Sequence, residues 1–361
     1  MIRCVSKRIG FLSFGHWQQG GGSRTPTAAD ALNQTIELAQ AAEAIGIDGA
    51  YVRVHHFAPQ LASPFPLLAA IGARTERIEI GTAVIDMRYE NPLYMAEEAA
   101  AADLIAGGRL QLGLSRGSPE PALHGSRSFG YVPPEGSTDA DAARTKTAVF
   151  REAIAGVGFA QSDPAMTGGN FMLPVQPQSP GLRDRIWWGS GTRETARWAA
   201  AEGMNLQSST LLSEDTGVPF AELQAEQIDA YRDAWIAAGW EREPRVSVSR
   251  SVIPIVTDED RAWFGGHRHQ DHDQLGNLEG ITARFGRSYT GEPDRIAAEL
   301  AKDAAVQMAD TLLLTVPNQL GVEYCAAMLE TIARHIAPAI GWAPSSAKPE
   351  QHATSVGEAS R

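Results

Sequence analysis

The sequence predicts an α/β protein that folds as a single (β/α)8 (TIM) barrel, with insertions after the fourth and the seventh predicted strands. Eight short apolar runs follow one another along the chain, and each is followed by a segment with helical periodicity. The chain has 361 residues, which is enough for two average domains but is also an ordinary length for one α/β barrel. A doubly wound sheet shows the same alternation and is the structural alternative.

The predicted strands are runs of apolar and β-branched residues that end at glycine, proline or polar turn residues. We expect them at Arg8–Gly15, Gly49–Val54, Ile78–Ile85, Leu110–Leu114, Arg185–Trp188, Met204–Ser208, Arg245–Val256 and Thr311–Val316. The predicted helices carry apolar residues with a period of about 3.6, which places those residues on one face. We expect them at Ala28–Ile45, Phe65–Arg74, Leu93–Ile105, Asp139–Ala155, Arg193–Glu202, Phe220–Ala238, Asp258–Phe264, Pro293–Lys302 and Gly321–Ile340.

The clearest strand–helix–strand unit lies in the segment 77–119. Ile78–Ile85 is rich in β-branched residues, as suits a strand buried on both faces. Asn91-Pro92 then starts a helix, and Gly107-Gly108 ends it. Because a helix joins Ile78–Ile85 to Leu110–Leu114, we expect these strands to lie parallel with a right-handed crossover.

Two long segments lack a clear periodicity and form the predicted insertions. Gly156–Asp184 is rich in Gly, Pro, Gln and Ser, and a small hairpin is expected around Asn170–Val175. Gly265–Gly291 is the second insertion. Unstructured loops of this length are unusual in a compact domain unless they are functional. The barrel is expected to cover residues 1–342, and the Pro- and Ser-rich segment Ala343–Arg361 is expected to be a disordered tail.

Composition and charge argue against several classes of partner and site. The formal net charge is −12, so neither nucleic acid nor an anionic membrane is expected as a partner. No apolar run approaches the length of about 20 residues that spans a membrane, and no signal peptide is recognisable, so a cytoplasmic protein is expected. Cys4 and Cys325 are too few for a disulfide framework or a cysteine metal site. Three histidines between His267 and Asp273 are only a compositional hint, and no metal site is expected.

Two adjacent histidines, His55 and His56, follow the second predicted strand. In a barrel of this kind the reactive groups lie where strands end and loops begin, so these positions are candidates for chemistry. Histidine titrates near neutral pH and is a common general base. The alternative is one hydrogen-bonded core histidine and one surface histidine.

An anion site is indicated at Ser190-Gly191-Thr192, between the fifth predicted strand and a helix. The free N–H groups and the positive dipole end of a helix N-terminus suit a phosphate. An ordinary serine or threonine N-cap is the alternative. Arg116, after the fourth strand, could pair with a phosphate through charge-assisted hydrogen bonds, or it could be a solvated loop charge.

Four short motifs occur in a fixed order: Gly-Thr-Ala at Gly81–Ala83, Pro-x-x-x-Ala-Glu at Pro92–Glu97, Asp-Leu-x-x-Gly-Gly-Arg at Asp103–Arg109 and Gly-x-x-Arg-Gly at Gly113–Gly117. In this order and spacing they resemble the luciferase-like flavin monooxygenases, the family of bacterial luciferase. Further matches run from Arg8 to about residue 340, so the resemblance covers nearly the whole chain.

The resemblance implies a role for each candidate residue. The first histidine of the family's Glu-His-His-Phe pattern lies beside the flavin ring and transfers a proton; this role maps to His55, although Val54 stands where the family has glutamate. The flavin phosphate site and its surroundings map to Ser115, Arg116, Arg144, Ser190, Gly191, Thr192 and Thr195. The strand beneath the ring maps to Thr82 and Ala83, with a cis peptide bond between Ala83 and Val84. Phe14, Trp17, Phe57 and Phe65 are expected to line the substrate side, together with His56.

The resemblance also implies a reaction. We expect a monooxygenase that uses reduced FMN and O2 to oxygenate a small or medium-sized organic substrate, such as an aldehyde, another carbonyl compound or an alkane. A separate NAD(P)H:flavin reductase is expected to supply the reduced FMN, because no segment resembles an NAD(P)H site. A homodimer or a higher even oligomer is expected. The alternatives are an oxidoreductase that uses coenzyme F420 and a flavin-binding barrel without catalytic activity. Ser115 stands where luciferase itself has cysteine, which argues against a luciferase.

Overall fold

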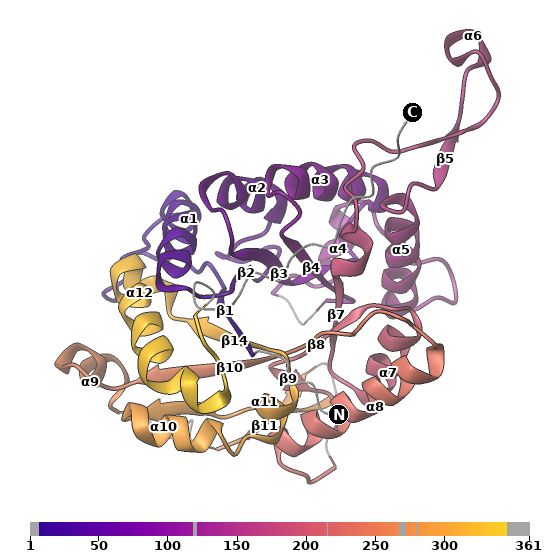
Figure 1. Cartoon of the computed structure of the whole chain (residues 1–361). Helices are drawn as coiled ribbons and strands as arrows, with labels where there is room; N and C mark the ends of the chain where they lie inside the picture. The colour runs from indigo at the N-terminus through magenta and orange to yellow at the C-terminus, as the bar shows by residue number, and fades with distance from the viewer. Residues whose placement is uncertain (1–6, 118–120, 215, 267–271, 279–280, 345–361) are drawn as a thin grey trace, which may run out of the picture.

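Eight parallel strands close into a barrel in the computed structural model, which describes residues 7–117, 121–214, 216–266, 272–278 and 281–344 (Figure 1). In barrel order they are β1 (Arg8–Ser13), β2 (Gly49–Val52), β3 (Glu79–Asp86), β4 (Leu110–Ser115), β7 (Ile186–Ser190), β8 (Asn205–Ser208), β10 (Val246–Pro254) and β14 (Thr311–Val316). The ring closes because β10 pairs with both β8 and β14, and β14 pairs with β1. The predicted (β/α)8 barrel is therefore confirmed, and a doubly wound open sheet is not formed.

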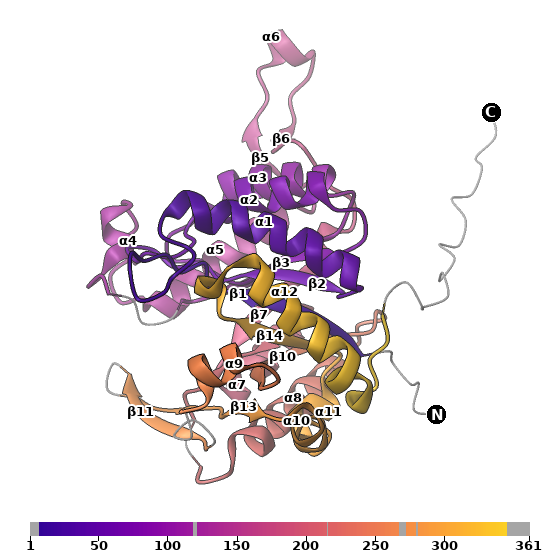
Figure 2. The same ribbon diagram turned by 90° about the vertical axis from the view of Figure 1, so that its left-hand side faces the viewer.

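The helices surround the barrel as an outer layer (Figures 1 and 2). The main ones are α1 (Ala28–Ile45), α2 (Pro64–Arg74), α3 (Pro92–Ile105), α5 (Asp139–Ala153), α7 (Arg193–Ala201), α8 (Phe220–Ala238), α10 (Pro293–Leu300) and α12 (Gly321–Thr331). Shorter ones are α4 (Gly125–Ser128), α6 (Pro164–Thr167), α9 (Asp258–Phe264) and α11 (Ala304–Met308). The predicted last helix reaches Ile340, but beyond Thr331 it changes to a π turn and then a 3-10 turn. Pro338, which has no N–H to donate, lies in this final turn.

The strand–helix–strand unit of the four motifs shows how local sequence sets local structure. Asn91 Oδ1 accepts hydrogen bonds from the N–H groups of Leu93 and Tyr94, which caps α3. The guanidinium of Arg109 donates to the carbonyls of Gly72, Thr75, Ile78 and Ala106, and so ties the turn before β4 to the end of α2 and the start of β3. The Gly-Gly-Arg motif is thus explained by folding, without a direct role in a site.

The hydrophobic core fills the space between the strands and the helices. Ile9, Ile80, Leu112 and Val248 are fully buried on neighbouring or opposite strands. This burial on both faces accounts for the continuous apolar runs that predicted the strands.

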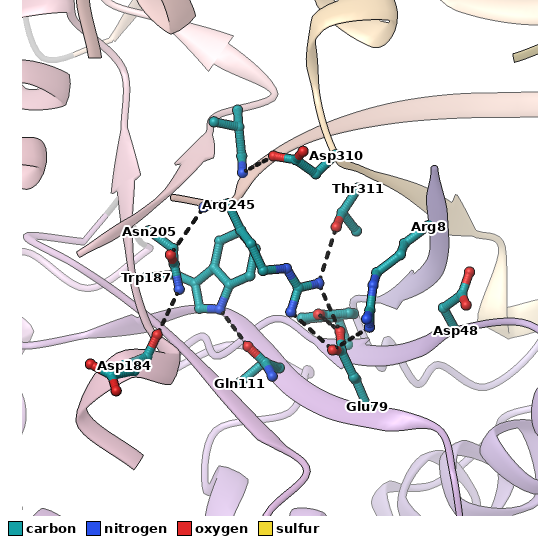
Figure 3. Close-up of polar contacts among 12 residues, drawn as sticks. Arg8, Asp48, Glu79, Gln111, Asp184, Trp187, Asn205, Arg245, Asp310 and Thr311 are labelled. Atoms are coloured by element: carbon teal, nitrogen blue, oxygen red, sulfur yellow. Dashed lines mark hydrogen bonds and ion pairs between the residues drawn. The ribbon is translucent and has the colours of Figure 1, made fainter. Parts of the chain in front are cut away.

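A polar network closes the barrel at the N-terminal ends of its strands (Figure 3). Glu79 at the start of β3 is paired with Arg8 of β1 and with Arg245, which precedes β10. The indole N–H of Trp187 donates to Gln111 Oε1 at 2.8 Å. Since this end of the barrel is filled by paired side chains, the opposite end is the place for a ligand site.

The two predicted insertions contain short strands. The first holds a hairpin of β5 (Gly158–Gln161) and β6 (Met172–Pro174), which extends away from the barrel with α6 at its tip (Figure 2). The predicted hairpin is therefore present, with a partner strand that begins before Asn170. In the second insertion, β12 (Ile281–Phe285) pairs with β11 (Gln274–Leu278) and β9 (Leu211–Leu212), while β13 (Ser288–Gly291) adds to β10. Residues 267–271 of the histidine cluster and 345–361 of the expected tail lie outside the described residues.

Strands β1, β2 and β10 each end two residues earlier than predicted, at Ser13, Val52 and Pro254. The chain leaves β2 because the N–H of His55 donates to the carbonyl of Leu61, at 2.8 Å, instead of to a neighbouring strand. His55 therefore lies on the loop after the strand. In the described part of the chain, no helix is both long and apolar enough to span a membrane.

Candidate functional site

A cavity of about 480 Å³ opens at the C-terminal ends of the strands. Small-molecule sites commonly have volumes of about 300–1,000 Å³. Nine of the predicted site residues line this cavity: Phe14, His55, Ala83, Ser115, Arg116, Arg144, Gly191, Thr192 and Thr195. A larger, more open groove of about 780 Å³ lies between α1 and α12, and none of the predicted residues lines it. The smaller cavity is therefore the candidate site.

Five predicted residues are not among the described residues that line the cavity: Trp17, His56, Phe57, Thr82 and Ser190. The hydroxyl of Thr82 donates to the carbonyl of Gly113 at 2.9 Å, within the sheet. His56 stacks on Tyr89, with ring centres 3.9 Å apart. Phe57 is 54% exposed and packs edge to face against Phe129. Phe65 lies in the apolar core.

His55 lies on the loop after β2 and lines the cavity together with Arg53 of the same loop. Its side chain is buried, with 8% exposed. Burial, followed by the charges of Arg53, His56 and His16, lowers the pKa of His55 to about 4. The imidazole is therefore neutral at pH 7 and can accept a proton.

The wall below the cavity contains small and apolar residues. Ala83 and Val84 line it, and the peptide bond between them is cis, as the family resemblance implied. A side chain on Gly189 would come within 2.9 Å of Val84, so glycine keeps this side of the cavity open. A flat ligand could lie against this part of the wall.

The N-terminus of α7 forms another part of the cavity lining. Thr192 is its N-cap, and its hydroxyl accepts a hydrogen bond from the N–H of Thr195 at 3.1 Å. The N–H of Arg193 donates to the carboxylate of Glu214 at 3.2 Å. The carboxylate of Glu214 is an anion already bound at this helix end, as expected for exposed N–H groups and a positive dipole.

Two arginines add positive charge on this side. The guanidinium of Arg144 lies over the ring of Trp198 on α7, at 5.0 Å from the ring centre. Arg116 follows β4 and is exposed at the cavity. Arg116, Arg144 and the N-terminus of α7 together provide the positive charge and the hydrogen-bond donors that a phosphate binds.

A buried polar network supports the α7 loop from behind, and the sequence reasoning did not find it. Gln227 on α8 accepts a hydrogen bond from the hydroxyl of Ser208 and donates to the carbonyl of Ser190. Gln224 donates to Ser208 and to the carbonyl of Ser209. Both glutamines are almost fully buried, so two glutamines on the apolar face of a predicted helix were the available signal.

Four charged residues that line the cavity were also missed: Asp86 at the end of β3, Arg88 after it, Asp139 at the start of α5 and Arg53 after β2. Arg88 binds Asp86 at 2.6 Å and approaches Asp139 at 3.6 Å, and all three line the cavity. Arg53 lines the cavity next to Phe14 and His55. Within the described residues, no group of three or more His, Cys, Asp or Glu is placed to hold a metal ion.

The residues present fit a flavin mononucleotide. The cavity joins a wall of small residues to a helix end that already binds a carboxylate, which matches a planar ring system with an anionic tail. Ala83 and Val84 would lie against the ring, and Gly191, Thr192, Thr195, Arg116 and Arg144 would hold the phosphate.

A family model for luciferase-like monooxygenases matches residues 9–313, which is most of the chain. The chain belongs to the luciferase-like monooxygenase family. The four motifs that suggested this membership therefore identified the family correctly.

Relatives of this luciferase-like chain include proteins with and without a known activity. An uncharacterized protein of Sinorhizobium fredii is 30% identical over 211 residues, which are 57% of this chain and 58% of that protein. The match thus spans little more than half of that relative. The oxygenase component of flavin-dependent trigonelline monooxygenase from Acinetobacter baylyi is 23% identical over 288 residues, 74% of this chain and 76% of the relative.

Solved structures share the barrel at low sequence identity. The oxygenating constituent of 3,6-diketocamphane monooxygenase from Pseudomonas putida, in complex with FMN, aligns with a TM-score of 0.66 and 16% identity, covering 92% of this chain and 98% of that one. An F420-dependent secondary alcohol dehydrogenase aligns with a TM-score of 0.60 and 16% identity, covering 93% and 99%. Both comparisons support the fold of the luciferase-like chain.

Proposed function

We propose that this protein is a flavin-dependent monooxygenase that uses reduced FMN and O2 to oxygenate a small or medium-sized organic substrate. One observation carries the proposal. The same cavity is lined by a buried neutral histidine, His55, and by a helix N-terminus flanked by Arg116 and Arg144. A proton acceptor and a phosphate site in one cavity are what a flavin oxygenase needs.

The chain's own residues then have separate tasks. Bound reduced FMN supplies the electrons that activate O2. The backbone of Gly191 and the hydroxyls of Thr192 and Thr195 bind the phosphate, while Ala83 supports the ring. His55 accepts or returns a proton at its imidazole nitrogen, and the surrounding buried wall excludes water from the reaction.

Two partners belong to this proposal. A separate NAD(P)H:flavin reductase supplies the reduced FMN, which is supported by the relative from Acinetobacter baylyi that is named as an oxygenase component. A second copy of the chain is the other partner, giving a homodimer or a higher even oligomer. Helix α3 supports this, because Tyr94, Leu104 and Ile105 on it are exposed to 69%, 49% and 55%.

Coenzyme F420 is the second candidate cofactor, since an F420-dependent dehydrogenase shares the fold over 93% of this chain. In that case the protein would transfer a hydride without O2. A flavin-binding barrel with no catalytic role is the third reading, and His55 argues against it, because a protein that only binds flavin needs no proton acceptor in the cavity.

Titration of the purified protein with FMN, reduced FMN and F420, followed by absorbance and fluorescence, distinguishes these readings. The monooxygenase proposal expects the tightest binding for reduced FMN, and incorporation of one oxygen atom from 18O2 into product. Preferential binding of F420, with turnover in the absence of O2, would instead establish the hydride-transfer reading.

A further inference from the structure

One polar side chain in the cavity wall has an unsatisfied atom. Gln207 on β8 lines the cavity, and 5% of the residue is exposed. Its Nε2 donates to the carbonyl of Thr82 on β3 at 3.1 Å, whereas its Oε1 is buried and accepts no hydrogen bond. Of the described side chains that line the cavity, Gln207 alone has such an atom. Because buried polar atoms in folded proteins nearly always have a hydrogen-bond partner, this oxygen calls for an explanation.

The orientation of the Gln207 amide follows from its neighbours. The carbonyl of Thr82 can only accept a hydrogen bond, so the amide nitrogen faces Thr82 and the oxygen faces away from it. The amide also lies against Gly113 on β4, where an added Cβ would come within 2.1 Å of Oε1. Gly113, the first glycine of the Gly-x-x-Arg-Gly motif, therefore makes room for the amide. The glutamine thus reaches across the barrel interior, from β8 past β7 to β3 and β4.

A second glutamine inside the barrel provides a comparison. Gln111 on β4 is also buried, but its Oε1 accepts a hydrogen bond from the indole N–H of Trp187 at 2.8 Å (Figure 3). Gln111 is not among the described residues that line the cavity. The amide oxygen is therefore satisfied at the closed end of the barrel, and it is unsatisfied in Gln207, where a ligand can approach.

Gln207 borders the part of the wall that we assign to the flavin ring. Thr82, to which it donates, directly precedes Ala83. Gly189, its partner in the register of β7 and β8, keeps the wall open beside Val84. The residues assigned to the phosphate lie elsewhere, on the loops after β4 and β7 and on α5 and α7. Gln207 is therefore placed to contact the ring rather than the phosphate.

We propose that Gln207 binds the ring of the flavin, with its Oε1 accepting a hydrogen bond from a ring N–H. The unsatisfied atom is an acceptor, so the group that completes it must be a donor. A flavin ring offers the N3–H in both oxidation states and, after reduction, the N5–H as well. The last torsion of a glutamine side chain has a broad minimum, so the amide can turn toward such a donor. This inference rests on the proposed flavin-dependent function, and it makes Gln207 a residue that recognises the ring.

Flavin binding to a variant of nearly the same volume tests the assignment. Gln207→Met removes the amide, and affinities for FMN and riboflavin are measured by quenching of protein fluorescence, with oxidised flavins and, in the absence of O2, with reduced flavins. We expect reduced FMN and reduced riboflavin to bind about tenfold more weakly, the usual effect of leaving a buried donor unpaired. Equal losses for the two flavins place the effect at the ring, which both molecules share. Arg116→Gln, by contrast, should weaken FMN alone.

The oxidised flavins identify the donor. If they lose the same factor as the reduced forms, N3–H is the donor, and 3-methyl-FMN, which lacks it, should bind the wild-type protein and the variant equally. If only the reduced forms lose affinity, N5–H is the donor, and the reduction potential of the bound flavin should fall in Gln207→Met. Both results support the proposal.

Gln111→Met is the matched control, because it removes a buried glutamine from outside the cavity. It should lower thermal stability and leave flavin affinity unchanged. The proposal is overturned if Gln207→Met binds reduced FMN as tightly as the wild-type protein does, if it weakens FMN but not riboflavin, or if Gln111→Met has the same effect on flavin affinity.

The remaining outcomes also decide. If the wild-type protein binds FMN and one of these results is found, the role of Gln207 alone is refuted; if it binds neither flavin, the proposed function and this inference fail together. Should circular dichroism show that Gln207→Met does not fold, reduced 3-methyl-FMN and reduced 5-deaza-FMN, which each lack one of the two donors, are tested on the wild-type protein. Affinities equal to that of reduced FMN for both analogues would overturn the proposal.

Discussion

The guanidinium of Arg245, which precedes β10, forms two parallel hydrogen bonds with the carboxylate of Glu79 on β3, at 2.9 and 3.0 Å. These strands are not neighbours in the barrel, so the pair spans the closed end of its interior (Figure 3). Burial raises the pKa of Glu79, but the charges of Arg245 and Arg8 outweigh it and hold the pKa below its ordinary value. The pair therefore joins opposite sides of the barrel with an ionised carboxylate.

Replacing Glu79 with Gln should destabilise the barrel, because two arginines would lose their counter-charge. Removal of one partner from a buried ion pair lowers the free energy of unfolding by about 3–5 kcal/mol. Denaturant titration at pH 7 measures the change. Glu330→Gln is the control, since Glu330 pairs with Arg334 at the surface and its loss should change stability by less than about 1 kcal/mol. Equal effects in the two variants would show that the Glu79 pair contributes no more to stability than a surface ion pair does.

His55→Ala should lower turnover and leave flavin affinity almost unchanged. General acid–base catalysis typically contributes about 10²–10⁴ in rate, and His55 is the histidine that lines the cavity. His56→Ala should have a smaller effect, because His56 stacks on Tyr89. Single-turnover formation of product, with reduced FMN, O2 and substrate supplied, compares the two variants. A slower reaction in His56→Ala than in His55→Ala would assign the proton transfer to His56.

The plot of kcat/KM against pH should fall on its acid side at about pH 4. The pKa of His55 is lowered to about 4, chiefly by burial, so the imidazole remains unprotonated from pH 7 down to about pH 5. Protonation at lower pH removes the base, and kcat/KM should then fall. Measurement of kcat/KM between pH 3.5 and pH 8 checks this for as long as the protein stays folded, which circular dichroism monitors. A limb near pH 6.5 would mean that a solvated histidine is the base.

Arg116→Ala should weaken FMN binding by roughly 1.5–3 kcal/mol if Arg116 pairs with the phosphate. Fluorescence titration measures the loss. Riboflavin, which lacks the phosphate, provides the control, and its affinity should be the same for the wild-type protein and the variant. An equal loss for FMN and riboflavin would place Arg116 near the ring, and no loss for either would make it a solvated loop charge.

Light scattering at micromolar concentration should give the mass of a dimer or a higher even oligomer. The exposed apolar residues of α3 are the proposed contact, so Leu104→Glu should shift the mass toward the monomer. Ile236→Glu on α8 is a matched control, because Ile236 is 76% exposed on a different helix. A monomeric wild-type protein would contradict the proposed association.

The sequence alone was sufficient to predict the barrel fold and to identify the family. The alternation of apolar runs and amphipathic segments records which residues face the core, and that pattern is local along the chain. The four motifs contain turns and caps whose geometry depends on near neighbours, such as the cap at Asn91 and the turn at Arg109. For the same reason, the sequence was sufficient to predict that His55 and the Ser190–Thr192 loop lie at strand ends.

Only the tertiary structure decided which of these residues share one cavity. His55 and His56 are adjacent in sequence, but the chain leaves β2 before them, and only His55 reaches the cavity. Arg53, Arg88, Gln224 and Gln227 lie far from the α7 loop in sequence or carry no motif. Their roles depend on closure of the barrel, which brings β2, β3, β8 and α8 around one space. Contacts between residues so distant in the chain leave no local periodicity in the sequence. The arginines that line the cavity and the glutamines that support its loop could therefore be identified only from the structure.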